Sequence, residues 1–167
     1  MAAHEPSPAD AHEILPRLWL GNAKASMDDP FLRQNQIQVV FNCTKNYPFS
    51  PSIPIPYRVP VDDNLKEEEI RNMELWASEV AYRILSEYQQ GRTILVHCAA
   101  GIQRSAASVA FFLIAYRSMH TNEAIAFIQS RRPIAFRPRP NFLRAIESFD
   151  RRFHSEILPE LQHSHYE

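Results

Sequence analysis

TILVHCAAGIQRSAASVAFFLIAY, residues 93–116, is the stretch around which the rest of the chain is organised. Its first four residues follow a turn signal at Gly91 and are apolar or β-branched, which predicts a short buried strand over residues 93–96. Residues 105–116 are apolar on nearly every face, which predicts a buried central helix. The loop between them delivers its last backbone N–H groups to a helix N-terminus, where an anion is attracted. The stretch therefore predicts a site for a phosphate-like anion.

The side chains of this loop indicate nucleophilic chemistry at the bound anion. Cysteine reacts as the thiolate, and we expect Cys98 to lie among inward-pointing N–H groups, near a helix N-terminus and near Arg104, all of which favour the charged form. Gly101 allows backbone angles that a side chain would forbid. Arg104 offers a planar set of donors that matches two oxygens of a phosphate group. The alternative is a structural cysteine beside a core histidine and a helix-capping serine, but burial requires neither this glycine nor this arginine.

The pattern His97-Cys98-x-x-Gly101-x-x-Arg104-Ser105 resembles the signature of the cysteine-dependent protein phosphatases. The resemblance implies that Cys98 attacks phosphorus and that Arg104 binds the phosphoryl oxygens. It also implies that His97 orients the loop and supports the thiolate, and that Ser105 assists breakdown of the thiophosphate. The implied phosphate-binding residues are Ala99, Ala100, Gly101, Ile102, Gln103 and Arg104. Residues 14–21, ILPRLWLG, and residues 140–142, PNF, are similar to two other segments of the dual-specificity phosphatases.

Phosphoryl transfer to sulfur also needs a group that protonates the leaving oxygen and then activates water. One carboxyl group can serve both steps if it lies on a loop near the phosphate-binding loop, residues 98–105, which we call the cradle. Asp62 and Asp63 follow a predicted strand. The run PVDDN, residues 60–64, resembles the family segment P-V-x-D-N, which implies that Asp63 is the general acid. Asp62 is then a solvent-facing or capping residue. Turn and helix capping before Glu67 is the alternative role for both aspartates.

Composition is that of a soluble protein with one domain. The chain has 167 residues, of which 45% are hydrophobic and 22% charged. No apolar run approaches the ~20 residues needed to cross a bilayer, and the polar start lacks a signal-peptide core. We therefore expect an intracellular protein of the cytoplasm or nucleus. The HCAAG form also resembles small viral members of the family, for which the location would be the host cytoplasm or the virion.

Acidic residues outnumber basic ones over residues 1–90, and the reverse holds over residues 91–167, which contain the cradle. The two cysteines show no spacing typical of a zinc site or a disulfide framework, so we expect neither a metal ion nor a cofactor. Cys43 has two open interpretations. In some relatives a second cysteine forms a disulfide with the nucleophile, while a thiol in a core strand is also ordinary.

Strand and helix patterns alternate along the chain. Strands are expected over residues 13–22, 37–43 and 57–61, and helices over residues 25–35, 67–90, 121–131 and 141–153. Residues 1–11 are polar and rich in Pro, Ala and Ser, so a disordered arm is expected there. The catalytic domain is expected over residues 12–153, followed by a C-terminal tail over residues 154–167 that is loose after Glu156.

This alternation predicts a single α/β domain with a mostly parallel central sheet flanked by helices, similar to the protein tyrosine phosphatases, and a cradle at the carboxyl end of a strand. The resemblance favours a small dual-specificity phosphatase, a signalling hydrolase that dephosphorylates tyrosine, serine and threonine in proteins through a phosphocysteine intermediate. Phosphorylated proteins and kinases are the expected partners. No membrane or nucleic-acid partner is expected, and the oligomeric state is open.

Three other functions use the same cradle. Phosphoinositide phosphatases carry lysines where this chain has Ala99 and Ile102. RNA 5′-triphosphatases carry a Thr-His pair and a Thr-Gly end, where this chain has Ala99-Ala100 and Ser105-Ala106. Pseudophosphatases bind phosphoproteins without turnover and usually lose the cysteine, the arginine or the acid. This chain retains all three groups, which favours an enzyme that acts on proteins.

Overall fold

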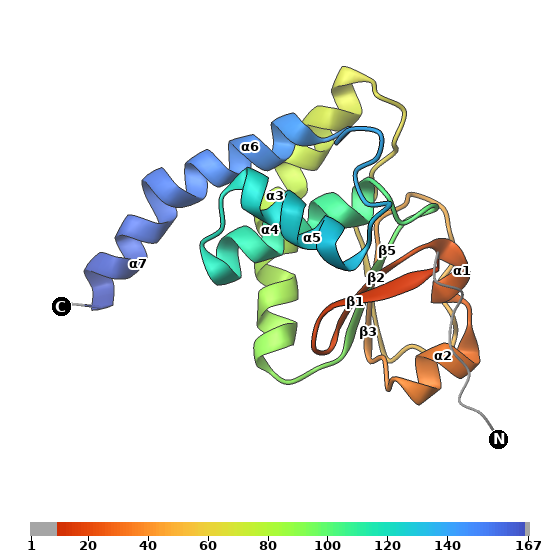
Figure 1. The fold of residues 1–167 in the computed structure, drawn as a ribbon. Coiled ribbons are helices and arrows are strands. Elements are labelled where there is room, and N and C mark those ends of the chain that lie inside the picture. Colours follow the sequence, from red (N-terminus) through yellow and green to blue (C-terminus); the bar gives the residue numbers. More distant parts are fainter. Residues whose placement is uncertain (1–9, 166–167) are drawn as a thin grey trace.

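The computed structural model describes residues 10–165, with side chains up to residue 162 (Figure 1). Its centre is a five-stranded sheet in the order β1-β2-β5-β3-β4. The strands are β1 (Ala11–Leu15), β2 (Leu18–Gly21), β3 (Val39–Asn42), β4 (Ile55–Arg58) and β5 (Ile94–His97). β1 and β2 form an antiparallel hairpin, and all other neighbours in the sheet run parallel. This confirms the predicted α/β domain with a mostly parallel sheet.

The helices cover both faces of the sheet. They are α1 (Ala23–Ser26), α2 (Asp29–Gln34), α3 (Glu67–Gln89), α4 (Arg104–Arg117), α5 (Thr121–Arg131), α6 (Leu143–Arg152), the π-helix η1 (Phe153–Ile157) and α7 (Leu158–His165). α1 and α2 lie on one side, while α3 to α6 pack together on the other, with α4 inside this layer (Figure 1). No helix among residues 10–165 is both long and apolar enough to cross a membrane.

Successive side chains of the central strands alternate between two cores, as the two-residue period of a strand requires. In β5, Ile94 and Val96 belong to the larger core under α3, α4 and α6, while Leu95 belongs to the smaller core, with Phe31 of α2. β5 is buried on both faces and is the middle strand of the sheet, with a parallel neighbour on each side. The loop that follows it is therefore anchored at the centre of the molecule.

The two ends of the described chain differ from expectation. Most of the predicted arm, residues 1–9, lies outside the described residues, but β1 begins at Ala11, within the stretch assigned to the arm. At the other end, the chain does not become loose after Glu156. The helix of α6 continues through η1 into α7, which extends away from the body of the protein (Figure 1). Pro159 stands in the first turn of α7, and the wider turn of η1 precedes it.

The expected helix over residues 25–35 is divided into α1 and α2. Asp28 is the N-cap of α2, because its Oδ1 accepts a hydrogen bond from the backbone N–H of Phe31 at 3.2 Å. A side-chain cap in the middle of a helical stretch starts a new helix, and Pro30 follows in the first turn. The other predicted helices agree with α3, α4, α5 and α6 to within a few residues.

Candidate active site

The predicted cradle occupies the expected place. β5 ends at His97, the loop turns over residues 98–103, and α4 begins at Arg104. In the register of the sheet, His97 lies between Gly21 of β2 and Asn42 of β3. The cradle therefore lies at the carboxyl ends of three parallel strands, where α/β folds bind ligands.

The backbone carbonyl groups of residues 99–102 all point out of the loop, where each accepts a hydrogen bond from a neighbouring segment. The donors are Ala23 N to Ala99 O at 3.1 Å, Arg132 Nη2 to Ala100 O at 3.3 Å, Arg132 Nε to Gly101 O at 2.8 Å and Phe136 N to Ile102 O at 2.8 Å. Within the described part of the chain, the N–H groups of residues 99–103 donate no hydrogen bond. A loop with its carbonyls held outside and its N–H groups free is an anion-binding site.

Cys98 lies at the floor of this loop, where it is 2% exposed. Its Sγ is 3.1 Å from the Oγ of Ser105, the second residue of α4. The hydroxyl can therefore donate a hydrogen bond to a thiolate at this position, which is the contact that a departing sulfur needs. The predicted nucleophile and the predicted assisting hydroxyl are in direct contact.

Arg104 connects the cradle to the loop that carries the predicted acid. Its Nη1 donates to the backbone oxygen of Val61 at 3.0 Å, two residues before Asp63. Its Nε is buried and has no hydrogen-bond partner among residues 10–165. A guanidinium with one edge anchored and a buried donor left over is suited to bind an oxyanion, because such a donor is costly to leave unsatisfied.

Gly101 cannot be replaced without displacing the cradle. Its φ is +70°, in the left-handed region that favours glycine. A Cβ at this position would lie 2.5 Å from the backbone oxygen of Gly21 and 2.7 Å from Nη2 of Arg132. The loop therefore packs directly on the end of β2 and on the guanidinium that holds its carbonyls.

His97 is completely buried, and its Nδ1 lies 3.3 Å from the backbone oxygen of Cys98. Burial lowers its pKa to about 4, the backbone hydrogen bond to Cys98 opposes this, and the positive charges of Arg58 and Arg104 lower the pKa further. The imidazole is neutral at pH 7, so Nδ1–H donates to the carbonyl. His97 thus orients the loop without adding a positive charge beside the sulfur.

Asp62 and Asp63 have different surroundings. Asp63 is exposed, and its Oδ1 accepts a hydrogen bond from Asn141 Nδ2 at 2.9 Å. Asp62 forms an ion pair with Lys45 at 3.3 Å, and Lys45 also binds Glu69 at 2.7 Å. Asp62 is therefore tied to Lys45, whereas Asp63 is held by Asn141.

Sequence reasoning missed Arg132. This side chain is fully buried behind the cradle, where it holds two loop carbonyls and lies 2.9 Å from Nδ1 of His12. Burial lowers its pKa, and the charges of Cys98 and Asp10 raise it. Arg131, the residue before it, is exposed. Two adjacent arginines with the same chemistry gave no signal that one of them supports the catalytic loop.

Gln103 was expected among the phosphate-binding residues, and its side chain has a supporting contact. Its Nε2 donates to the backbone oxygens of Arg137 at 3.3 Å and Arg139 at 2.9 Å, and its Oε1 accepts from the N–H of Asn141 at 2.8 Å. The amide therefore fixes residues 137–141 beside the cradle. Asn141 in turn holds Asp63, so the acid loop and the cradle share one support.

Cys43 is fully buried in the core, and its Sγ lies 3.4 Å from Ser108 Oγ. Burial raises its pKa to about 12, and the hydrogen bond with Ser108 opposes this increase only in part. At neutral pH it is therefore a protonated thiol. This favours the packing interpretation over that of a reactive partner for Cys98.

Comparison with known proteins gives a consistent result. The family profile "Dual specificity phosphatase, catalytic domain" matches residues 18–152. The chain is 36% identical to rat dual specificity protein phosphatase 18 over 140 residues, which are 83% of this chain and 66% of that protein. It is 31% identical to human dual specificity protein phosphatase 8 over 151 residues, or 89% of this chain, but 23% of that protein. The chain thus spans less than a quarter of the length of the longer relatives.

Solved structures show the same fold. A mouse putative dual specificity phosphatase, crystallised as a complex with zinc tungstate, matches with a TM-score of 0.77 at 24% identity, over 93% of this chain and 96% of the other. The crystal structure of DUSP15 matches with a TM-score of 0.76 at 25% identity, with the same coverage of both chains.

Proposed function

Because the chain belongs to the dual specificity phosphatase catalytic-domain family, we propose that it hydrolyses phosphotyrosine and phosphoserine or phosphothreonine in proteins. The reaction runs through a phosphocysteine intermediate on Cys98 and uses no cofactor. The observation that carries this proposal is the cradle itself. The loop that carries Cys98 has four outward carbonyls and unengaged N–H groups, and the buried Nε of Arg104 has no hydrogen-bond partner among the described residues.

In the first step, the Cys98 thiolate attacks phosphorus and the bond from phosphorus to the substrate oxygen breaks. The free N–H groups of the loop and Arg104 bind the three remaining phosphoryl oxygens and stabilise the charge they carry in the transition state. Asp63 gives its proton to the leaving oxygen, so the dephosphorylated side chain departs as a neutral hydroxyl.

In the second step, water attacks the phosphocysteine. The Asp63 carboxylate takes a proton from this water, the sulfur–phosphorus bond breaks, and inorganic phosphate forms. Ser105 Oγ, 3.1 Å from Sγ, donates a hydrogen bond to the sulfur as its negative charge returns. Cys98 and Asp63 end the cycle in the states in which they began it.

Protein substrates suit the surroundings of the cradle better than polyanionic headgroups do. Ala99 and Ala100 are exposed at its rim, and Ile102 is partly exposed, so the loop itself adds no side-chain cation besides Arg104. A phosphate on an extended peptide needs one strong anion site, whereas a multiply phosphorylated headgroup needs more positive charge. Phosphorylated proteins are therefore the proposed partners, with kinases among them, and the proposed place of action is the cytoplasm or the nucleus.

A rapid-quench experiment tests the proposal. Wild-type protein mixed with a ³²P-labelled phosphotyrosyl peptide should give a burst of free tyrosyl peptide and an acid-stable labelled protein, and Cys98→Ser should give neither. Phosphoserine peptide, phosphoinositide and RNA 5′-triphosphate are compared in parallel. Turnover confined to one of the last two would overturn the choice of substrate. Tight binding of phosphopeptide without turnover by the wild type would identify a pseudophosphatase.

A further inference from the structure

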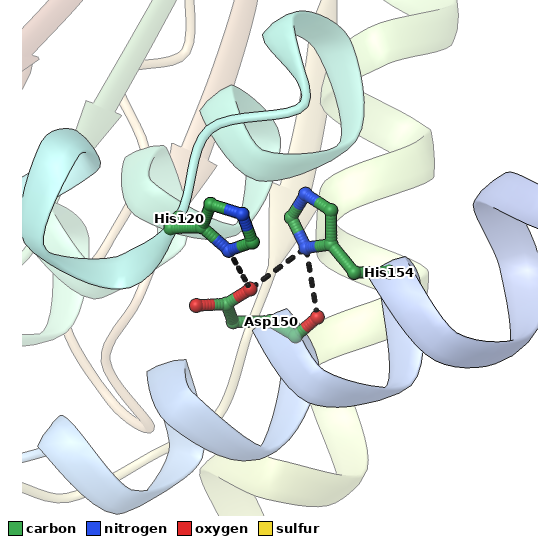
Figure 2. A group of neighbouring side chains, drawn as sticks. All are labelled: His120, Asp150 and His154. Carbon is green, nitrogen blue, oxygen red and sulfur yellow. Dashed lines mark hydrogen bonds and ion pairs between the residues drawn. The ribbon is translucent and has the colours of Figure 1, made fainter.

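A second cluster of reactive side chains lies on the helical layer, outside the cradle (Figure 2). His120 precedes α5, Asp150 lies in the last turn of α6, and His154 belongs to η1. One ligand atom from each residue lies within 4.8 Å of the others. Oδ1 of Asp150 is 3.0 Å from Nδ1 of His120 and 2.7 Å from Nδ1 of His154. A single carboxylate oxygen thus faces two ring nitrogens.

The second ring nitrogen of His154 and the second carboxylate oxygen of Asp150 are each held by hydrogen bonds to other residues. Nε2 of His154 is 3.1 Å from the backbone oxygen of Ser118, and because a carbonyl oxygen only accepts, this nitrogen carries a proton. Oδ2 of Asp150 accepts from both the N–H and the hydroxyl of Thr121 at 2.8 Å. Metal-binding histidines and carboxylates in proteins are oriented by such outer hydrogen bonds, which leave the inner atom for the ion.

The atoms that face one another, Oδ1 of Asp150 and Nδ1 of each histidine, need a positive charge among them. In a neutral His154 ring with its proton on Nε2, Nδ1 carries a lone pair. That lone pair would face Oδ1 of Asp150 at 2.7 Å and the backbone oxygen of the same residue at 3.1 Å. Acceptors in contact repel one another unless a proton or a metal ion lies among them.

We propose that His120, Asp150 and His154 form a binding site for a divalent transition-metal ion, with zinc as the best fit. Two imidazole nitrogens and one carboxylate oxygen are ligands that zinc accepts, and imidazole disfavours magnesium and calcium. Around a tetrahedral ion with bonds of about 2.0 Å, ligand atoms lie roughly 3.3 Å apart. The contacts of 2.7 and 3.0 Å are therefore shorter than this by about 0.6 and 0.3 Å, and the side chains must move apart by these amounts to admit the ion.

The site is accessible and has room for a fourth ligand. The side chain of His120 is 63% exposed, while those of Asp150 and His154 are 15% and 20% exposed. A surface hollow of about 320 Å³ is lined in part by His120, Asp150 and Glu147. A water molecule or the Glu147 carboxylate can complete the coordination. Arg151 also lines this hollow, and its positive charge opposes the binding of a cation. Its Nη1 is 3.9 Å from Glu147 Oε2.

A bound ion would link the connection between α4 and α5 to the long helix that runs from α6 into α7. We had expected no metal ion, because the two cysteines show no spacing typical of a zinc site. His120 lies far from the other two residues in the sequence, so only the fold brings the three together.

Metal titrations of the tag-free, full-length Cys98→Ser protein test the proposal, since this variant removes a competing thiolate. The protein is stripped with chelator and titrated with Co²⁺, whose visible absorption reports tetrahedral coordination, and then with Zn²⁺ in competition. We expect one equivalent to bind, a rise of several degrees in melting temperature with Zn²⁺, and no rise with Mg²⁺. His120→Ala alters an exposed residue and should weaken Zn²⁺ binding at least ~10-fold, and His154→Ala should abolish it.

The control is His163→Ala with His165→Ala, which removes two other histidines and should leave the affinity unchanged. Two results would overturn the proposal. If Zn²⁺ neither binds nor changes the melting temperature, the cluster is held by protons alone. If binding survives His120→Ala and His154→Ala but is lost in the control variant, the ion belongs to residues 163–165.

Discussion

The burial of neutral His97 makes the stability of this protein depend on pH in a predictable way. The ordinary pKa of histidine is 6.5, and in the folded protein that of His97 is about 4. Between these values the unfolded chain binds a proton that the folded chain rejects, so acid favours unfolding. The contribution of His97 to stability is complete above pH 6.5, falls as the pH drops toward 4, and then changes no further.

The size of the effect follows from the two pKa values. A shift of about 2.5 units corresponds to about 3.4 kcal/mol at most, at about 1.4 kcal/mol for each unit. Between pH 7.5 and pH 5.5 the folded state stays neutral while the unfolded state becomes mostly protonated, so the expected loss is about 1.4 kcal/mol. For a chain of this size that loss lowers the melting temperature by roughly 3 to 6 °C.

Urea unfolding followed by circular dichroism at pH 5.5, 6.5 and 7.5 measures this loss. The wild type is compared with His97→Asn, which keeps a polar side chain but does not titrate. Other groups, including His12 and His154, titrate in both proteins and cancel in the difference. The stability advantage of the wild type should shrink by about 1.4 kcal/mol from pH 7.5 to pH 5.5. Parallel pH profiles for the two proteins would refute the reasoning, because His97 would then titrate normally in the fold.

Four further predictions concern the cradle and its surroundings. Cys98→Ser should abolish turnover but still bind phosphopeptide, because the loop N–H groups and Arg104 remain. Calorimetry measures this binding, and detectable steady-state hydrolysis above a mock-purified control would contradict the mechanism. Asp63→Asn should lower kcat by ~10²-fold or more on substrates with poor leaving groups, while Asp62→Asn should do little, and an exchange of these effects would place the acid one residue earlier. Arg132→Met should weaken binding of vanadate, an oxyanion that mimics phosphate. The adjacent control, Arg131→Met, should not. Equal effects would mean that the hydrogen bonds from Arg132 to the loop do not support anion binding. Arg137→Ala with Arg139→Ala should raise KM for acidic phosphopeptides and leave hydrolysis of a small aryl phosphate nearly intact, because both residues are exposed beside the cradle. Equal losses of activity on both substrates would mean that the two arginines take part in the chemical step.

The local parts of the fold and site could be predicted from the sequence, because each depends on residues close together in the chain. The strand before Cys98, the loop and α4 carry one continuous pattern, and the structure places them where that pattern predicts. Asp63 was found by its resemblance to a family segment, and its role stays a prediction.

The unpredicted features depend on tertiary contacts. Arg132 is buried because it meets two carbonyls of a loop some thirty residues earlier, and no local property separates it from Arg131. The helix beyond Phe153 was not expected, and it continues past Pro159 directly after the wider turn of η1. The cluster of His120, Asp150 and His154 likewise joins segments that only folding brings together.

The outward carbonyls of the cradle determine how much of the chain must be present before any chemistry is possible. Cys98, Arg104, Ser105 and Asp63 all lie in the first 105 residues, but three of the four hydrogen bonds that hold the loop open come from later residues, Arg132 and Phe136. A fragment that ends before Arg132 would contain every reactive side chain and have no formed anion site. During synthesis, the nucleophile would therefore leave the ribosome well before its binding site can close around it, and the nascent chain would be inactive until its last third has folded.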